Sequence, residues 1–280
     1  MSVAQIRRQL EHHGLHLSSD LGQSFMVDEF QARRLARLSG VGADDTVIEV
    51  GTGLGALTRA LAECAARVVT IEIDSGLVRA LESEATLPPN VELIHGDALE
   101  MDLHAIVASA EAGVRVVANL PYSAATPLLR RLLDASELLL DWSVMVQREL
   151  GERLLASPGS RDYGSFAVLH QLVAEPECAA RLGPRSFYPA PRVESWFLRI
   201  RPRSDSPLRA GELEWVERVV RACFGQRRKT IANSLRGGGL PQSGDRRRLA
   251  EAFDVAGIDP AIRAEKLSPE TLLELARALA

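Results

Sequence analysis

The first 147 residues alternate short apolar, β-branched runs with longer segments in which apolar residues recur at helical spacing. The strand-like runs cover 46–50, 68–73, 91–95, 114–118 and 142–147. Short continuous apolar runs favour strands, and a 3.6-residue period favours helices. Elements that alternate in this way build a parallel sheet with helices on both faces. The pattern therefore predicts an α/β fold of the Rossmann-like type.

Two expected helices flank the first of these strands. Asp28 is a suitable N-cap for a helix over 29–38, which should end near Gly40. The strand 46–50 stops at glycines, and an Ala- and Leu-rich helix over 55–65 follows it. A strand, a glycine turn and a helix in this order are the expected opening of a nucleotide-binding unit.

The pattern changes after the last strands. Residues 175–182 and 193–201 are expected to be a late strand pair that closes the sheet in antiparallel fashion. A polar, proline-bearing stretch follows at 202–207, and beyond it every periodic segment is helical. These helices are expected over 212–224, 227–236, 245–255 and 268–279. We therefore expect a catalytic domain over 1–204 and a small all-α domain over 205–280.

Composition favours a folded, cytoplasmic protein. Of its 280 residues 46% are hydrophobic, which is enough for a sizeable core. The sequence has no apolar run of the roughly 18 residues that a membrane span needs, and residues 1–20 lack the apolar centre of a secretory signal. Cys64, Cys178 and Cys223 are scattered without metal-binding spacing, which argues for a reducing compartment and against structural zinc. We expect no metal site and no membrane partner.

Charge is distributed unevenly along the chain. The formal net charge is -4, which by itself would count against a nucleic-acid partner. The stretch 181–249, however, holds sixteen Arg and Lys against six Asp and Glu, so it is +10 while the remainder is -14. This local basic surface is compatible with RNA phosphates.

A glycine-rich loop follows the first strand. It reads Glu49-Val50-Gly51-Thr52-Gly53-Leu54-Gly55, and its glycines let the backbone pass close beneath a ligand. The spacing Gly-x-Gly-x-Gly differs from the dinucleotide pattern Gly-x-Gly-x-x-Gly, and Glu49 favours S-adenosylmethionine over a pyrophosphate cofactor. Taken alone the loop is weak evidence, since it could be a tight connection or an NAD site.

Two further acids at strand ends support a nucleoside ligand. Glu72 ends the second strand, where a carboxylate can accept hydrogen bonds from both ribose hydroxyls. Asp97 follows the third strand, where it could read the adenine amino group of the cofactor, although a helix cap is an alternative role. Together with Glu49, three acids at successive strand ends indicate one S-adenosylmethionine site.

The tetrad Asn119-Leu120-Pro121-Tyr122 follows the fourth strand and is the most informative motif. The N6 amino group of adenine is a poor nucleophile because its lone pair is delocalised into the ring. The Asn119 side-chain oxygen and the Leu120 carbonyl could accept its N–H bonds and hold the nitrogen closer to tetrahedral. Pro121 would stiffen the loop, and Tyr122 would stack on an extruded base. An isolated tetrapeptide of this kind would more often be an ordinary turn.

With these motifs in place, the sequence resembles the ribosomal RNA adenine dimethyltransferase family, the KsgA or RsmA type that modifies small-subunit (16S) RNA. The resemblance runs from about Leu21 to the C-terminus. Its marks are the stretches 21–26, 51–55, 119–122, 187–195, 224–230 and 263–265. It implies a class I methyltransferase fold with a small all-α C-terminal domain. It also implies N6,N6-dimethylation of two adjacent adenosines in the 3'-terminal hairpin during ribosome biogenesis, with S-adenosylhomocysteine as the product.

The resemblance also assigns roles to single residues. It implies donor contacts for Ser24, Met26, Gly51, Gly53, Glu72, Asp97 and Asn119. Phe187 would stack on the target adenine opposite Tyr122, although a packed loop aromatic is the usual role of such a residue. Arg227, Arg228 and Lys229 would hold RNA phosphates at the head of a helix, the alternative being a solvated basic face. The implied partner is an immature small ribosomal subunit, and we expect a monomer.

Some positions depart from the family pattern. Ser24 stands where asparagine is usual, and Thr52 stands where proline is usual. Ser123-Ala124-Ala125 replaces the commoner Asn-Ile-Ser, which affects the shape of the adenine pocket. Ser18-Ser19-Asp20 lies where the family carries lysines, so we expect RNA affinity to shift towards the basic stretch 181–248.

Three other functions remain open from the sequence. The first is methylation of large-subunit RNA by an enzyme of the antibiotic-resistance type, which usually lacks the Gly-Gln-Arg-Arg-Lys-Thr segment at 225–230. The second is a ribosome-assembly factor with weak or lost methylation. The third is DNA adenine methylation, which Asn119 disfavours because those enzymes commonly begin the tetrad with an acid.

Overall fold

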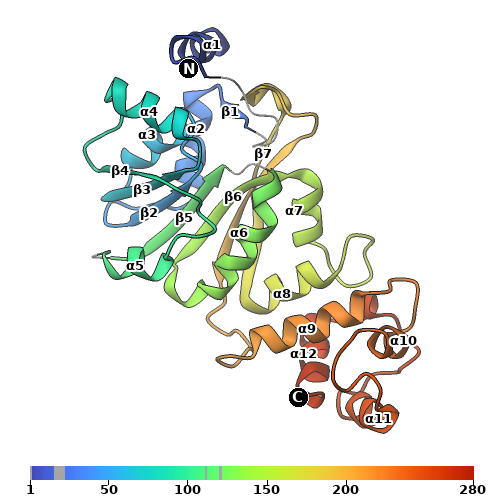
Figure 1. Cartoon of the computed structure of the whole chain (residues 1–280). Helices are drawn as coiled ribbons and strands as arrows, with labels where there is room; N and C mark the ends of the chain where they lie inside the picture. Colours follow the sequence, from blue (N-terminus) through green and yellow to red (C-terminus); the bar gives the residue numbers. More distant parts are fainter. Residues whose placement is uncertain (1, 16–22, 111, 120–121) are drawn as a thin grey trace. The chain divides into compact units, whose positions relative to one another are not determined.

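A computed structural model describes residues 2–15, 23–110, 112–119 and 122–280 (Figure 1). The chain forms two compact units. The first comprises Met1–Gly151 and Glu177–Pro202, and the second comprises Glu152–Pro176 and Arg203–Ala280. The sequence predicts a boundary at residue 204, close to Pro202, after which the chain leaves the first unit for the last time. The sequence pattern does not indicate that 152–176 belongs to the second unit, because the residues that this segment contacts there are distant in the sequence.

A seven-stranded sheet forms the centre of the first unit, in the order β4-β3-β2-β5-β6-β9-β7 (Figure 1). Its strands are β2 (Thr46–Val50), β3 (Arg67–Glu72), β4 (Val91–His95), β5 (Val114–Asn119), β6 (Asp141–Gln147), β7 (Ala174–Leu182) and β9 (Ser195–Pro202). Neighbours from β4 to β6 are parallel, and β9 pairs antiparallel with β6. The predicted α/β class and the antiparallel closure by β9 are confirmed. The parallel strands place their carboxyl ends at one edge.

Helices flank this sheet in the first unit. They are α1 (Val3–His12), α2 (Glu29–Leu38), α3 (Ala56–Ala62), α4 (Ser75–Glu84), α5 (Leu103–Ala108), α6 (Tyr122–Asp134) and α7 (Arg148–Leu154), the last of which runs into the second unit. The predicted cap of α2 is confirmed, since Asp28 accepts a hydrogen bond from the Phe30 amide. One core cluster contains Leu35 of α2, Leu61 of α3 and Phe197 of β9.

A second, two-stranded sheet joins distant parts of the chain. β1 (Phe25–Met26) pairs antiparallel with β8 (Phe187–Tyr188), so that Met26 lies opposite Phe187. Helix α1, which the sequence did not predict, packs Ile6 and Leu10 into a cluster with Phe25. The segment before the glycine loop is therefore fixed by residues from both ends of the first unit.

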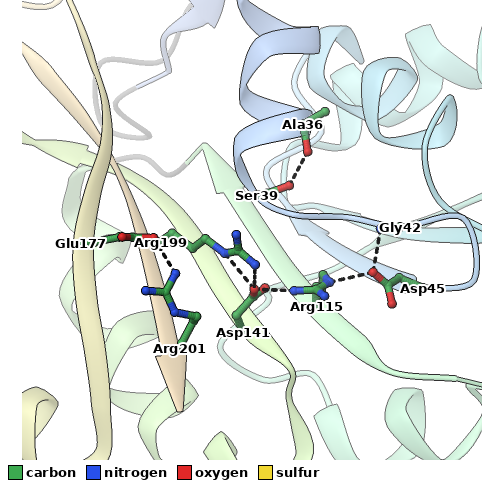
Figure 2. Close-up of polar contacts among 9 residues, drawn as sticks. All are labelled: Ala36, Ser39, Gly42, Asp45, Arg115, Asp141, Glu177, Arg199 and Arg201. Atoms are coloured by element: carbon green, nitrogen blue, oxygen red, sulfur yellow. Dashed lines mark hydrogen bonds and ion pairs between the residues drawn. The ribbon is translucent and has the colours of Figure 1, made fainter. Parts of the chain in front are cut away.

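An ion cluster lies at the sheet edge where the parallel strands begin (Figure 2). Asp141, the first residue of β6, accepts from Nε and Nη2 of Arg199 at 2.9 and 2.6 Å, and also from Nη1 of Arg115. Arg115 Nε donates to Asp45 Oδ2 at 2.7 Å. Gly40 packs directly under the Arg199 guanidinium, where a Cβ would approach Nη2 to 2.3 Å. The cluster joins four segments of the first unit.

Helices α8 (Ser165–Val173), α9 (Leu213–Phe224), α10 (Ile231–Arg236), α11 (Arg246–Val255) and α12 (Pro269–Ala278) build the second unit. The fully buried Tyr163 donates to the Leu267 carbonyl at 2.9 Å and packs edge-on against Phe224. Trp215 of α9 donates to the Ala276 carbonyl of α12 at 2.7 Å. The Tyr163 contacts hold residues 152–176 to the C-terminal part of the unit, and the Trp215 hydrogen bond joins α9 to α12.

One predicted helix begins too early. The sequence predicts a helix over 227–236, but residues 226–229 form a turn in which the Lys229 amide donates to the Gln226 carbonyl. Thr230 is the N-cap of α10, with an extended backbone and a side chain that accepts from the Asn233 amide. The threonine hydroxyl offers the backbone a cap in place of a further helical turn, so the helix starts at Ile231.

Candidate active site

A cavity of about 220 Å³ lies in the first unit at the carboxyl edge of the parallel strands. The predicted site residues that line it come from six separate segments. They are Ser24, Met26, Gly51, Gly53, Glu72, Asp97, Asn119 and Phe187. Residues as far apart in the sequence as Ser24 and Phe187 thus share one pocket, as expected for ligand sites at the carboxyl edge of an α/β sheet.

The glycine loop lines this cavity. Gly51 and Gly53 have φ angles of 85° and 57°, the left-handed region that favours glycine. A Cβ on Gly51 would lie 3.1 Å from the Asn119 carbonyl oxygen, and one on Gly53 would lie 3.1 Å from the Phe25 ring. The loop therefore needs glycine both for its backbone conformation and for its close approach to β5 and β1.

Glu72, the last residue of β3, ties its strand to the glycine loop. Its Oε2 accepts from the Gly53 amide at 2.8 Å and its Oε1 accepts from the Asp74 amide at 3.0 Å. The side chain is buried, and this burial raises the pKa of its carboxyl group despite the two amide donors. Each carboxylate oxygen keeps a second lone pair for a ligand hydroxyl.

Asp97 caps a turn and also lines the cavity. Its Oδ1 accepts from the Leu99 amide at 2.8 Å, so the side chain caps the turn that follows β4. The same residue lines the cavity. A carboxylate fixed in this way by a backbone donor can present its other oxygen to a ligand without losing its orientation.

Asn119 is the last residue of β5 and connects the tetrad to the N-terminal segment. Its Nδ2 donates to the Ser24 carbonyl at 3.3 Å, and this contact does not use the acceptor Oδ1. The Ser24 hydroxyl donates to the Pro189 carbonyl at 2.9 Å. Leu120 and Pro121 lie outside the described residues. Tyr122 begins α6, and the structure describes only its backbone.

The β1–β8 pairing places two further side chains in the cavity wall. Met26 and Phe187 are opposite each other in this pairing, and both are 4% exposed. Next to Phe187, the Tyr188 hydroxyl accepts from Arg7 Nε at 3.0 Å, and the Arg7 guanidinium lies over its ring. Helix α1 thus supports the aromatic side of the pocket.

Several lining residues escaped the sequence analysis. They include Gln23, Phe25, Leu54, Ile73 and Leu77. Gln23 Nε2 donates to Asp74 Oδ2 at 2.8 Å, which links the segment before β1 to the start of α4. Ile73 is 49% exposed, and an apolar side chain directly after the strand-ending Glu72 was a signal that could have identified it.

The three predicted RNA-binding residues lie in the turn before α10 in the second unit. Arg227 Nη2 donates to the Arg161 carbonyl and lies 3.9 Å from Glu265 Oε2. Arg228 and Lys229 are exposed. The guanidinium of Arg227 is therefore held within the unit, whereas the side chains of Arg228 and Lys229 extend into solvent.

Two negative findings apply to the described part of the chain. Among these residues no group of three or more His, Cys, Asp or Glu could hold a metal ion. Across the same residues, no helix combines the length and apolarity needed to cross a membrane.

Comparison with protein families gives a match along nearly the whole chain. Residues 14–280 match the family model described as "Ribosomal RNA adenine dimethylase". The chain is 40% identical to "Ribosomal RNA small subunit methyltransferase A" of Geobacter metallireducens, over 95% of this chain and 96% of the relative. It is 41% identical to the protein of the same name from Moorella thermoacetica, over 95% and 93%.

Solved structures share the fold. A dimethyladenosine transferase from Plasmodium falciparum has a TM-score of 0.76 at 21% identity, over 90% of this chain and 95% of that one. The 23S rRNA methyltransferase ErmE has a TM-score of 0.65 at 28% identity, over 91% and 99%. The fold is thus that of a class I S-adenosylmethionine-dependent methyltransferase with a C-terminal helical region, and the methyl donor that this implies is S-adenosylmethionine.

Proposed function

This chain belongs to the ribosomal RNA adenine dimethylase family, and we propose that it dimethylates N6 of two adjacent adenosines near the 3' end of small-subunit rRNA. The observation that carries this proposal is the single cavity that brings the glycine loop, two strand-end acids and Asn119 together. Relatives named for small-subunit methylation match at 40% and 41% identity over 96% and 93% of their length, which supports the choice of substrate.

The cavity fits S-adenosylmethionine. Glycines occupy the positions where the backbone must pass close under a ligand, and Glu72 offers two buried carboxylate oxygens to ribose hydroxyls. Asp97 would accept from the adenine amino group of the donor, and Ser24 and Met26 line the same cavity. When bound, the donor supplies a methyl group on a positively charged sulfur.

Asn119 would orient the nucleophile. Because its Nδ2 donates to the Ser24 carbonyl, the amide presents Oδ1 as the acceptor for an N–H of the target amino group. The Leu120 carbonyl would accept the second N–H. Two acceptors fixed in this way draw the nitrogen lone pair out of conjugation and direct it at the methyl carbon, which is chiefly an effect of positioning.

The target base would be held by aromatic stacking. Phe187 lies in the cavity wall, and Tyr122 opens the helix that follows the tetrad. Stacking on an extruded base contributes on the order of 1–3 kcal/mol and accepts a base taken out of its helix. Pro121, which directly precedes Tyr122 in the sequence, would limit the motion of the tetrad backbone.

The second unit would carry much of the RNA contact. Arg228 and Lys229 are exposed and free to meet phosphates, while Arg227 would contribute less because its guanidinium is already engaged. We keep the assignment of 1–204 to catalysis and of 205–280 to RNA binding as part of this proposal. A monomer acting in the cytoplasm on immature small subunits is the arrangement that we expect.

The test is nucleoside mass spectrometry of rRNA. Immature small subunits from cells that lack this methylation are incubated with the protein and S-adenosylmethionine, and mature methylated subunits serve as the control. We expect N6,N6-dimethyladenosine in small-subunit rRNA of the immature particles alone. Modification confined to large-subunit RNA would replace the proposal with the alternative suggested by the likeness to ErmE. Particle binding without any modified nucleoside would indicate an assembly factor.

A further inference from the structure

A buried network of hydroxyls lies behind the glycine loop. Glu49 of β2 is fully buried, and its Oε2 accepts from the hydroxyls of Thr58 and Thr70, both at 2.6 Å. The Thr70 hydroxyl also lies 2.7 Å from that of Thr52. Thr58 and Thr70 are 0% exposed and Thr52 is 4% exposed. The network therefore links the loop to β2, β3 and α3 out of contact with water.

The order of donors in this network follows from a count of protons. A threonine hydroxyl carries one proton, and that of Thr70 is directed at Glu49. In its contact with Thr70, Thr52 is therefore the donor. The chain of hydrogen bonds runs from Thr52 to Thr70 to Glu49, and Thr58 approaches the same carboxylate oxygen from α3. Its direction is fixed as long as Glu49 is ionised.

Thr52 is the residue of the glycine loop whose side chain is best suited to anchor the loop to the neighbouring strands. It stands between Gly51 and Gly53, which have no side chains and tolerate many backbone conformations. The Gly53 amide is held by Glu72, but that carboxylate lines the cavity and is also placed to bind the donor. The Thr52 hydroxyl instead fixes the loop through the hydroxyl of the fully buried Thr70.

Stability alone does not explain why an acid is buried at position 49. A buried carboxylate loses hydration and is costly unless it is well hydrogen-bonded. Glu49 Oε1 has no hydrogen-bond partner within the described part of the chain, so the hydroxyl donors all meet on Oε2. An apolar residue would avoid this cost but would leave Thr70, and through it Thr52, without an anchor.

We propose that Thr52 and Thr70 are positioning residues for methyl-donor binding, whose hydroxyls anchor the glycine loop to Glu49 in its donor-binding conformation. This inference rests on the proposed function, because it assumes that the cavity binds S-adenosylmethionine. Loss of either hydroxyl lets the loop populate other conformations, and the apparent donor affinity falls with the fraction that remains competent.

The test is calorimetric titration of S-adenosylmethionine into the full chain. A lost buried hydrogen bond should raise the donor Kd about fivefold to tenfold in Thr52→Val and in Thr70→Val. In turnover assays KM for the donor should rise by the same factor, with kcat within about twofold of the wild type. The double variant should bind about as weakly as either single variant, because both remove the same hydrogen bond.

Two controls separate positioning from general damage. Thr52→Ser keeps the hydroxyl and should bind the donor within about twofold of the wild type. Thr46→Val alters a buried threonine at the other end of β2 and should leave Kd unchanged. Equal donor Kd values for the wild type and Thr52→Val would overturn the inference, and so would Thr52→Ser binding as weakly as Thr52→Val. A wild-type chain that binds no donor would instead overturn the proposed function.

Discussion

Buried acids have different partners at the two edges of the seven-stranded sheet where its parallel strands begin and end. At the edge where the parallel strands begin, Asp141 is 1% exposed and is held by the guanidinium groups of Arg115 and Arg199 (Figure 2). At the edge where they end, Glu49 and Glu72 are equally buried but accept from hydroxyls and backbone amides. The buried carboxylate at the first edge is paired with positively charged groups, whereas those at the second edge have neutral hydrogen-bond donors.

This difference indicates which buried acids stabilise the fold and which can bind a ligand. A buried ion pair with its partners in place is closed to further ligands, and it fixes strands relative to one another. Carboxylates held only by neutral donors retain part of their desolvation cost, which raises the pKa of Glu72 and raises that of Glu49 to about 7. Of these acids it is Glu72 that lines the cavity, where a ligand can supply further donors.

The largest effect that we expect is on turnover at the carboxyl edge. Asn119→Ala removes the acceptor that orients the target amino group and should lower kcat by about a hundredfold to a thousandfold. Formation of N6,N6-dimethyladenosine in immature small subunits at saturating donor measures this, because a donor contact is also expected for Asn119. Turnover within tenfold of the wild type would show that this edge does not hold the catalytic acceptor.

At the opposite edge, Asp141→Asn should affect stability alone. The substitution leaves two guanidinium groups around a neutral side chain and should lower the free energy of unfolding by about 3 kcal/mol. Urea denaturation measures the loss. The matched control is Glu177→Gln, which removes an exposed partner of Arg201 and should cost less than about 1 kcal/mol. A tenfold change in donor affinity of Asp141→Asn would contradict the separation between the edges.

The pH dependence of stability should reveal the uncompensated charge of Glu49. Its pKa rises from 4.5 in the unfolded chain to about 7 in the fold, chiefly through burial, with Glu72 raising it and Arg59 lowering it. The folded state therefore binds the proton more tightly, and this stabilisation is lost as the pH rises from about 4.5 to about 7. Compared with Glu49→Gln, the wild type should lose about 2–3 kcal/mol over this range.

This prediction is checked by urea denaturation of both proteins at several pH values. Glu49→Gln cannot titrate at this position, so only the difference between the two proteins is informative. Parallel stability curves would mean that Glu49 keeps an ordinary pKa and that the two edges treat buried acids alike.

The smallest expected effect extends the comparison to the second unit. Arg228 and Lys229 are exposed, whereas Arg227 is engaged by the Arg161 carbonyl. Arg228→Ala with Lys229→Ala should weaken binding to a small-subunit rRNA fragment severalfold and reduce the salt slope of log Kd by about two. Arg227→Ala serves as the control and should change the slope less. A larger effect of Arg227→Ala would show that engaged charges also bind RNA.

Much of the catalytic edge was visible in the sequence, because local signals specify it. The strand at 46–50, the glycines after it and the acid at 72 are each recognisable from their immediate neighbours. Their assembly then follows from the parallel order of the strands. The cap at Asp28 could likewise be predicted from a single polar residue before an apolar pattern.

The remaining features depend on contacts between distant segments, which periodicity does not reveal. Helix α1 has only two buried residues, and their partner Phe25 lies in another segment. Asp141 and Arg199 meet only after β9 has paired with β6. The hydrogen bond between Thr52 and Thr70 likewise exists only because β2 and β3 are neighbours. Such residues look unremarkable in the sequence and acquire a role in the fold.

The pairing of β1 with β8 also determines when the cavity can exist during protein synthesis. Ser24 and Pro189, which join across this pairing, are 165 residues apart. A nascent chain that ends before Phe187 has the glycine loop and its acids but lacks one wall of the pocket. Such a distant contact closes late in folding. Donor capture thus requires a polypeptide that extends beyond Pro189, and shorter nascent chains have no complete methylation centre.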